Sequence, residues 1–258
     1  MNELNDYRSE TGDLDAPALL RWAATAFAGE TPADEPLVTL ASSLGAEDQV
    51  LAHMIASARL EVPVFTLDTG RMFAESYDLM ERTRAELGVT IRPYFPDADA
   101  VERMVAEDGP NLFYRSVDLR KRCCHVRKVE PLRRALAGKR AWITGLRRAQ
   151  SVTRAQLEVV EWDEQNELYK ISPLADWSEE DVWAYIRDHH VPYNALHDRG
   201  FPSIGCAPCT RAVAPGDDPR SGRWWWERPE HRECGLHVRD EAVGPADPKV
   251  RVSAVRLD

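Results

Sequence analysis

Residues 37–59, LVTLASSLGAEDQVLAHMIASAR, contain the pattern that decides the fold. Residues 37–41 form a short apolar run that predicts a β-strand, and residues 46–59 have the periodicity of an α-helix. The turn between them, SSLG at 42–45, consists mainly of small residues whose backbone N–H groups can approach an oxyanion at the helix N-terminus. A plain turn with a serine N-cap is the alternative. The Lys-Ser/Thr ending of a P-loop is absent here, so ATP hydrolysis of that kind is not indicated.

The same strand-and-turn pattern occurs twice more along the chain. The strand predicted at 62–68 ends in the turn DTGR, and the strand predicted at 141–144 is followed by a glycine and two arginines. Because the carboxyl ends of parallel strands meet at one edge of a sheet, the three turns together predict a nucleotide-sized anion site. Each turn alone is equally compatible with simple capping. The candidate ligand-binding residues are Ser42, Ser43, Gly45, Asp68, Thr69, Gly70, Arg71, Gly145 and Arg147.

Helices and strands alternate through residues 36–210, which predicts an α/β domain that binds a nucleotide. Beyond the segments above, a strand is expected at 90–95 and helices at 73–87, 97–107, 127–137 and 178–189. This alternation favours a mostly parallel sheet flanked by helices. Residues 1–35 predict a helical N-terminal extension. The chain after residue 192 is rich in Gly, Pro and Trp, so we expect residues 211–258 to form a loop-rich C-terminal segment packed on the sheet.

The composition excludes several classes of protein. The 258 residues carry a formal net charge of −10, which does not fit a general nucleic-acid binder. No run approaches the roughly 20 apolar residues of a membrane span, and the N-terminus, MNELNDYRSE, does not have the pattern of a signal peptide. We therefore expect a cytoplasmic globular protein. A homo-oligomer is also expected, of a size that the sequence leaves open.

Positive charge is concentrated in one block of the chain. Residues 115–154 contain thirteen basic side chains and two acidic ones. Such a block inside an acidic protein points to an anionic ligand such as a phosphate or sulfate. A solvated basic face is the simpler interpretation of a charge run, but the block also contains two of the five cysteines.

The cysteines form two close pairs and one isolated residue. Cys206 and Cys209 have the CxxC spacing of a metal site, a cluster site or a redox pair, and no thioredoxin-like βαβ unit surrounds them. Cys123 and Cys124 are adjacent, a spacing that a cluster of several irons accepts more readily than a single zinc ion. Two buried structural thiols are the alternative, but the nearby Arg and Lys residues favour thiolates. The pattern indicates a four-thiolate metal site and a separate reactive thiol.

The isolated cysteine lies in the element ECGLH near the C-terminus. A glycine follows Cys234, His237 lies three residues on, and four arginines precede it, an environment that favours the nucleophilic thiolate. An inert core cysteine is the alternative, against which the polar flanks argue. The tryptophans at 224–226 more often pin a loop to the core than dock a partner. His189, His190 and His197 have no spacing that indicates a ligand set.

Taken together, SSLGAED, LDTGR, the two cysteine pairs and ECGLH resemble the assimilatory adenylyl-sulfate (APS) reductase family over roughly residues 37–237. The resemblance implies a PP-loop-related, adenine-nucleotide α-hydrolase-like fold and a place in sulfate assimilation and cysteine biosynthesis. It also implies a [4Fe-4S] cluster held by the two cysteine pairs, with thioredoxin as electron donor. The related PAPS reductases lack both pairs, so the five cysteines place this chain on the APS side.

The resemblance also assigns roles to individual residues. Cys234 is the implied nucleophile, which attacks the sulfur of APS, releases AMP and keeps an S-sulfonate until a thioredoxin thiol frees sulfite. Unlike ATP pyrophosphatases, the turn lacks Gly-Gly-Lys-Asp-Ser, so ATP cleavage is not implied. PAPS reductase activity, an Fe–S tRNA-thiolation enzyme and a zinc-stabilised nucleotide-binding module remain the alternatives. The implied cluster ligands are Cys123, Cys124, Cys206 and Cys209, and the implied substrate ligands include Lys128, Arg220, Arg223 and His237.

Overall fold

The computed structural model describes residues 2–29, 31, 34–150 and 154–228. The predicted residues Cys234 and His237 therefore lie outside the described residues. Within that part of the chain, six strands form one sheet in the order β3-β2-β1-β4-β6-β5, and every neighbouring pair is parallel except β5 with β6. The predicted fold class is thus confirmed. The strands are Val38–Ala41 (β1), Val64–Leu67 (β2), Ile91–Tyr94 (β3), Ala141–Ile143 (β4), Val160–Asp163 (β5) and Leu168–Ile171 (β6).

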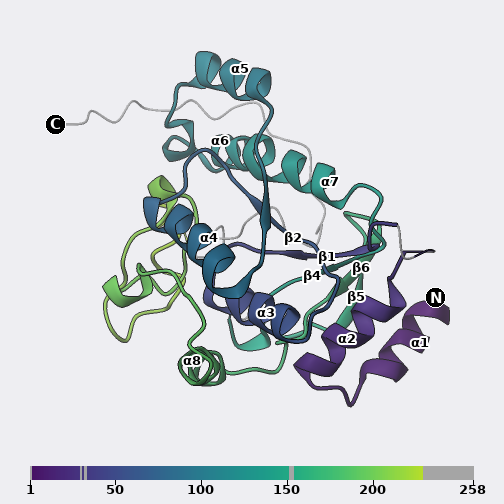
Figure 1. The fold of residues 1–258 in the computed structure, drawn as a ribbon. Coiled ribbons are helices and arrows are strands. Elements are labelled where there is room, and N and C mark those ends of the chain that lie inside the picture. The colour runs from purple at the N-terminus through teal and green to yellow at the C-terminus, as the bar shows by residue number, and fades with distance from the viewer. Residues whose placement is uncertain (1, 30, 32–33, 151–153, 229–258) are drawn as a thin grey trace.

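Helices cover both faces of the sheet (Figure 1). One face carries α5, α6 and α7, and the other carries α3, α8 and the two N-terminal helices. Two predicted helix starts are confirmed in atomic detail, because Asp97 accepts from the N–H of Ala100 and Ser178 forms a capping box with Asp181. The helices are Asn2–Thr11 (α1), Ala16–Ala26 (α2), Ala46–Ser57 (α3), Ala74–Leu87 (α4), Ala98–Asp108 (α5), Val117–Cys124 (α6), Glu130–Leu136 (α7) and Glu179–Asp188 (α8).

The helical region that carries the first cysteine pair begins earlier than predicted. The expected helix 127–137 is only the last part of it, since α6 comes first and a π-helix, His125–Val129 (η2), joins α6 to α7. The basic run hides the apolar periodicity that marks a helix. Cys123 and Cys124 consequently lie at the end of α6, immediately before the wider π turn.

The hairpin of β5 and β6 is absent from the sequence prediction. The edge strand β5 buries Val160 and the charged Glu161 and exposes Trp162, so it lacks the alternation of apolar and polar residues that marks a strand. Glu161 and Lys170 lie opposite each other and form an ion pair of 2.5 Å, which supplies the cross-strand contact.

The N-terminal segment forms two helices, α1 and α2, in agreement with the predicted helical extension. Both helices pack into the main hydrophobic core of the domain. Leu20 and Phe27 are fully buried in the same hydrophobic cluster as Leu40 of β1 and Ile143 of β4. Tyr7 of α1 contacts the Phe27 ring edge-on, with 5.5 Å between ring centres. The extension is therefore packed as part of the α/β domain.

The C-terminal section up to residue 228 packs on helices rather than on the sheet. Trp224 is 1% exposed and joins Met104, Phe113 and the cysteines 123 and 209 in a separate small hydrophobic cluster. This differs from the expected packing on the sheet, because α5 and α6 extend past the sheet and present their own apolar surface. The preferred interpretation of the tryptophan run is confirmed for Trp224, which fastens the loop to this cluster.

Candidate functional site

A cavity of about 1490 Å³ opens at the carboxyl ends of β1, β2 and β4. It lies where the strand order reverses between β1 and β4, which is the usual ligand position in such sheets. The structure brings most of the predicted binding residues to this cavity, but Asp68, Gly70 and Arg71 do not line it. The predicted residues that line it are Ser42, Ser43, Gly45, Thr69, Lys128, Gly145, Arg147, Cys206, Arg220 and Arg223.

The turn after β1 is organised around a buried carboxylate, Asp48. Its Oδ2 accepts hydrogen bonds from the backbone N–H of Ser43 at 2.6 Å and from the Ser43 hydroxyl at 2.7 Å. Burial raises the pKa of Asp48 to about 6, although the Ser43 hydrogen bonds act in the opposite direction. The Asp48 carboxylate therefore already uses two donors of the predicted phosphate cradle.

The turn after β4 approaches Asp48 so closely that only glycine fits. A Cβ on Gly145 would lie 2.4 Å from Asp48 Oδ1 and 2.9 Å from Glu47 Cβ. The first and third predicted turns are thus in contact, and the contact fixes the width of the cavity between them.

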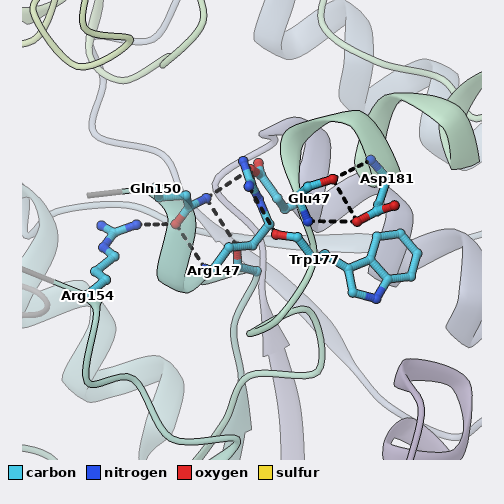
Figure 2. Close-up of polar contacts among 8 residues, drawn as sticks. Glu47, Arg147, Gln150, Arg154, Trp177 and Asp181 are labelled. Atoms are coloured by element: carbon cyan, nitrogen blue, oxygen red, sulfur yellow. Dashed lines mark hydrogen bonds and ion pairs between the residues drawn. The ribbon is translucent and has the colours of Figure 1, made fainter. Parts of the chain in front are cut away.

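An ion pair also joins these two turns (Figure 2). Arg147 binds Glu47 Oε1 through Nη2 at 2.8 Å and donates from Nη1 to the carbonyl of Trp177 at 3.3 Å. Gln150 donates to the same Glu47 oxygen at 2.9 Å, and its own oxygen accepts from Arg154. Arg147, predicted as an anion ligand, therefore faces the cavity with its charge balanced by Glu47.

The turn after β2 serves the cysteine loop as well as the cavity. Asp68 accepts from the N–H of Gly70 at 2.8 Å, so its carboxylate stabilises the turn itself. Thr69 Oγ1 lies 3.2 Å from Cys206 Sγ. Arg71 turns away from the large cavity, donates to Asn111 Oδ1 at 2.9 Å and lines a second, smaller cavity.

The basic block of residues 115–154 is mostly used within the protein. In the part of the chain that the structure describes, at least eight of its thirteen basic side chains form ion pairs with acids. Only a few of its cations, Lys128 among them, line the large cavity. The charge run alone therefore overstates the positive charge available to a ligand.

Of the two predicted C-terminal arginines, Arg223 is held firmly in the wall of the cavity. Its guanidinium donates to Ser203 Oγ at 3.1 Å and to the Ile204 carbonyl at 3.3 Å, and it lies 4.7 Å from the Trp224 ring centre. A Cβ on Gly205 would lie 2.3 Å from this guanidinium, so the glycine makes room for it. Arg220 lines the same cavity.

The second cavity, of about 20 Å³, gathers the two cysteine pairs. The Cys206–Cys209 pair belongs to a short 3₁₀ turn held by a hydrogen bond from Ala207 N–H to the Arg71 carbonyl at 2.8 Å. Among the described residues, no three His, Cys, Asp or Glu side chains converge closely enough to hold one metal ion. The residues lining this cavity are Arg71, Phe113, Arg120, Cys123, Cys124, Arg127, Lys128, Cys206, Pro208 and Cys209.

Burial disfavours negative charge on two of these thiols. It raises the pKa of Cys123, and with the neighbouring Cys206 it raises the pKa of Cys209 to about 12. Four thiolates here consequently require positive charge beside them. The lining arginines and Lys128 supply part of it.

Lys128 and Cys206 line both cavities. A ligand in the large cavity can therefore approach the cysteine pairs through these two side chains. Sequence reasoning missed Glu47, Asp48 and His197 as cavity residues. The first two lie at the start of the helix predicted at 46–59, directly after the SSLG turn, but nothing in the sequence identified His197, which lies about 150 residues further along the chain.

Comparison with known proteins identifies the class of protein that this fold and site define. The profile of the phosphoadenosine phosphosulfate reductase domain matches residues 37–212, and the chain belongs to that family. Among solved structures, a phosphoadenylyl-sulfate (PAPS) reductase from Candida auris in complex with phosphate is similar, with a TM-score of 0.66 and 31% identity over 81% of this chain and 95% of that one. An FMN adenylyltransferase from Candida glabrata shares the fold at a TM-score of 0.50 and 16% identity, covering 83% and 73% of the two chains.

Curated relatives are more similar still. Adenosine 5'-phosphosulfate reductase from Allochromatium vinosum is 55% identical over 219 residues, 85% of each chain. The protein of the same name from Burkholderia cepacia is 55% identical over 210 residues, 81% of this chain and 84% of its own. In the described residues, no helix is long and apolar enough to cross a membrane.

Proposed function

We propose that this protein reduces APS to sulfite and AMP in assimilatory sulfate reduction. The observation that carries the proposal is the wall shared by the two cavities, where Lys128 and Cys206 face both. A nucleotide at the strand ends would have its phosphosulfate directed to this wall. The names of the bacterial relatives support the same reaction.

The proposed chemistry is a sulfonyl transfer to Cys234. The Cys234 thiolate forms a bond to the APS sulfur while the bond from that sulfur to the phosphate oxygen breaks, and AMP leaves. A thioredoxin thiolate then attacks Cys234 Sγ, sulfite leaves with the electron pair of the S–S bond, and the second thioredoxin thiol resolves the mixed disulfide. The dithiol thus supplies both electrons.

The cations in the cavity wall suit this chemistry. Lys128, Arg220 and Arg223 line the cavity, where they can neutralise charge on the transferring group and on the departing phosphate. Arg223 is already oriented by Ser203 and Trp224, so little reorganisation is needed when the charge develops.

Four thiols line one cavity, and two of them, Cys123 and Cys124, are adjacent in the sequence, which suits a polynuclear iron–sulfur cluster better than one zinc ion. We propose a [4Fe-4S] cluster held by Cys123, Cys124, Cys206 and Cys209. When bound, it would supply positive iron charge to the thiolates and join the two cysteine segments. The protein is further proposed to work in the reducing cytoplasm, where thioredoxin is available and thiols stay free. A homo-oligomer stays a prediction.

Mass spectrometry of the trapped intermediate tests the reaction. Incubation with APS in the absence of thioredoxin is expected to add one sulfonate, located on the Cys234 peptide and removed by reduced thioredoxin. Cys234→Ser should keep the brown colour that an iron–sulfur cluster gives a protein, and it should still bind AMP. It should form no sulfonate adduct. An adduct on another cysteine, or normal sulfite release by the variant, would disprove the mechanism.

PAPS reduction is the second candidate, and the name of the Candida auris structure favours it. Anaerobic turnover with APS and with PAPS, measured as sulfite released, separates the two. We expect a clear preference for APS in kcat/KM. Equal values for the two nucleotides would remove the link between the cysteine pairs and substrate choice.

A further inference from the structure

Arg120 is the most deeply buried charged side chain near the cysteine cavity. It lies on α6 four residues before Cys124 and is 1% exposed. Its Nε donates to Glu227 Oε1 at 3.0 Å, and its Nη2 donates to Glu227 Oε2 at 2.8 Å. The Glu227 side chain is itself only 3% exposed, so this is a buried ion pair with the fork geometry of two parallel hydrogen bonds.

Arg120 makes two further contacts that link different parts of the molecule. Its guanidinium lies 5.0 Å from the ring centre of Trp224, the residue that fastens the C-terminal section to the helices. It also donates a hydrogen bond to Cys124. One side chain thus contacts a cysteine of the small cavity and two residues of the C-terminal section.

A buried pair of this kind is not an efficient source of stability. Removing two charges from water costs free energy that their attraction only partly returns, so apolar side chains of similar volume would often be at least as stable. The best-attested role of such a pair is to favour one arrangement of the two chain segments that carry it over other arrangements. Here the segments are α6 and the section that ends at Arg228, immediately before the residues that include Cys234.

The position of Glu227 limits where Cys234 can act. Cys234 follows Glu227 by seven positions, and an extended chain spans about 3.3–3.6 Å per residue, so chain length alone limits Cys234 to within about 25 Å of Glu227. Moving Glu227 by a few ångströms would shift by the same distance the volume that the Cys234 thiol can reach.

We propose that Arg120 and Glu227 are a positioning pair. The pair holds residues 224–228 against α6, the helix that carries Cys123 and Cys124, so that the following segment brings Cys234 to the substrate. Both residues are positioning residues, since the reacting sulfur atoms of the proposed function belong to Cys234 and to APS. This role rests on the proposed function, because delivery matters only if Cys234 is the nucleophile.

The test compares Glu227→Gln with a matched control, Glu161→Gln, in the purified, cluster-containing protein. Glu161 also forms a nearly buried ion pair, with Lys170, but neither residue lines a cavity. The Cys234 sulfonate formed from APS in a single turnover should appear about tenfold more slowly in Glu227→Gln, as remote misplacement predicts. AMP affinity, iron content and visible absorbance should stay within about twofold of wild type. The control should match wild type throughout.

A double variant, Arg120→Gln with Glu227→Gln, separates positioning from stability. It leaves no unpaired buried charge, so resistance to urea should recover relative to the single variant. Sulfonate formation should stay slow, because the ion pair no longer holds the position of residue 227 against α6. Recovery of the rate together with stability, or a wild-type rate in Glu227→Gln, overturns the proposal. If Glu227→Gln does not fold, the double variant alone decides.

Limited proteolysis keeps this test independent of the reaction. Cleavage within the last forty residues should be faster in Glu227→Gln than in Glu161→Gln, and equal cleavage counts against the positioning pair. If wild type forms no Cys234 adduct at all, the proposed function fails, whereas proteolysis still decides whether the pair holds the segment.

Discussion

Two arginine–glutamate pairs lie at the two cavities, with Arg147 and Glu47 lining the large one and Arg120 lining the small one, and they differ in what else joins their segments. Glu47 lies in the first turn of α3 and Arg147 follows β4, and a backbone ladder already joins β1 to β4. Arg120 and Glu227 join α6 to a loop section, and the contacts that the structure describes between these segments are made by side chains. The first pair therefore adjusts the charge of a site whose shape the sheet fixes. The second helps to fix the shape itself.

The largest effect of a substitution is expected at the cysteine cavity, where side chains rather than a backbone ladder hold the segments together. Cys206→Ser removes one proposed cluster ligand, so the protein should lose its brown colour and its bound iron, and its C-terminal section should become sensitive to proteases. Cys234→Ser is the control that should keep the iron. A brown, fully loaded Cys206→Ser protein would contradict the proposed ligand set.

At the sheet edge, a substitution at Gly145 should lower the free energy of unfolding but leave the protein folded. Gly145→Ala places a methyl group 2.4 Å from Asp48 Oδ1, and such overpacking costs about 1–3 kcal/mol. AMP affinity should fall as well, because both turns line the cavity. Urea unfolding and an AMP titration measure the two effects, with Gly12→Ala as the control, where the added Cβ meets only the Arg8 carbonyl oxygen at an ordinary 3.4 Å. Unchanged stability of Gly145→Ala would show that the turns separate easily.

The buried carboxylate gives the sheet edge a pH dependence. The pKa of Asp48 is raised to about 6 in the folded protein from an ordinary value of 3.8, so the folded state binds more protons between these values. The contribution of Asp48 to stability therefore decreases as pH rises from about 4 to 6, by about 2–3 kcal/mol in total, and is then constant.

Asp48→Asn tests this prediction because it keeps an acceptor for Ser43 and removes the titration. The stability difference, variant minus wild type, should grow as the pH of urea unfolding experiments is raised from 4.5 to about 6.5. A constant difference across this range would mean that Asp48 titrates normally.

The smallest effect is expected at the junction of the cavities. Thr69→Val removes the hydroxyl that lies 3.2 Å from Cys206 Sγ and keeps the side-chain shape. Fewer hydrogen bonds to cluster sulfur lower a reduction potential, so the variant should retain its iron and be harder to reduce. Redox titration against Thr69→Ser, which keeps the hydroxyl, measures the shift. Identical potentials would exclude a role for this contact.

The sheet edge could be predicted from the sequence because its signals are local. Each strand end and each following turn lies within about ten residues, and the small residues at 42–45 and 145 report a close backbone approach that the structure contains. The partners of these residues could not be predicted, since the pairing of Arg147 with Glu47 depends on how β1 and β4 align. The β5–β6 hairpin was missed because β5 buries a glutamate and exposes a tryptophan, the reverse of the pattern that predicts a strand.

For the small cysteine cavity, the sequence predicted which cysteines take part but not how the surrounding side chains are arranged. The two pairs are evident in the sequence, and the structure brings all four thiols to one small cavity. The direction of Arg71, which faces that cavity, and the pairing of Arg120 with Glu227 depend on packing between segments about forty to more than a hundred residues apart. No local pattern reports such distances.

The π-helix at His125–Val129 has a consequence for how this chain tolerates insertion and deletion. A π turn contains about one residue more than an α turn, and such turns are frequent at functional sites. Deleting one residue from it would convert the π turn into an α turn, and because each completes one full rotation, Cys123 and Cys124 would keep nearly the same direction relative to α7. Because α7 packs on β2 and β3, the sheet would hold α7 in place as well. A one-codon deletion at the π turn is therefore expected to leave the cysteine pair where it is, whereas the same deletion within α6 or α7 would turn the pair by about 100°.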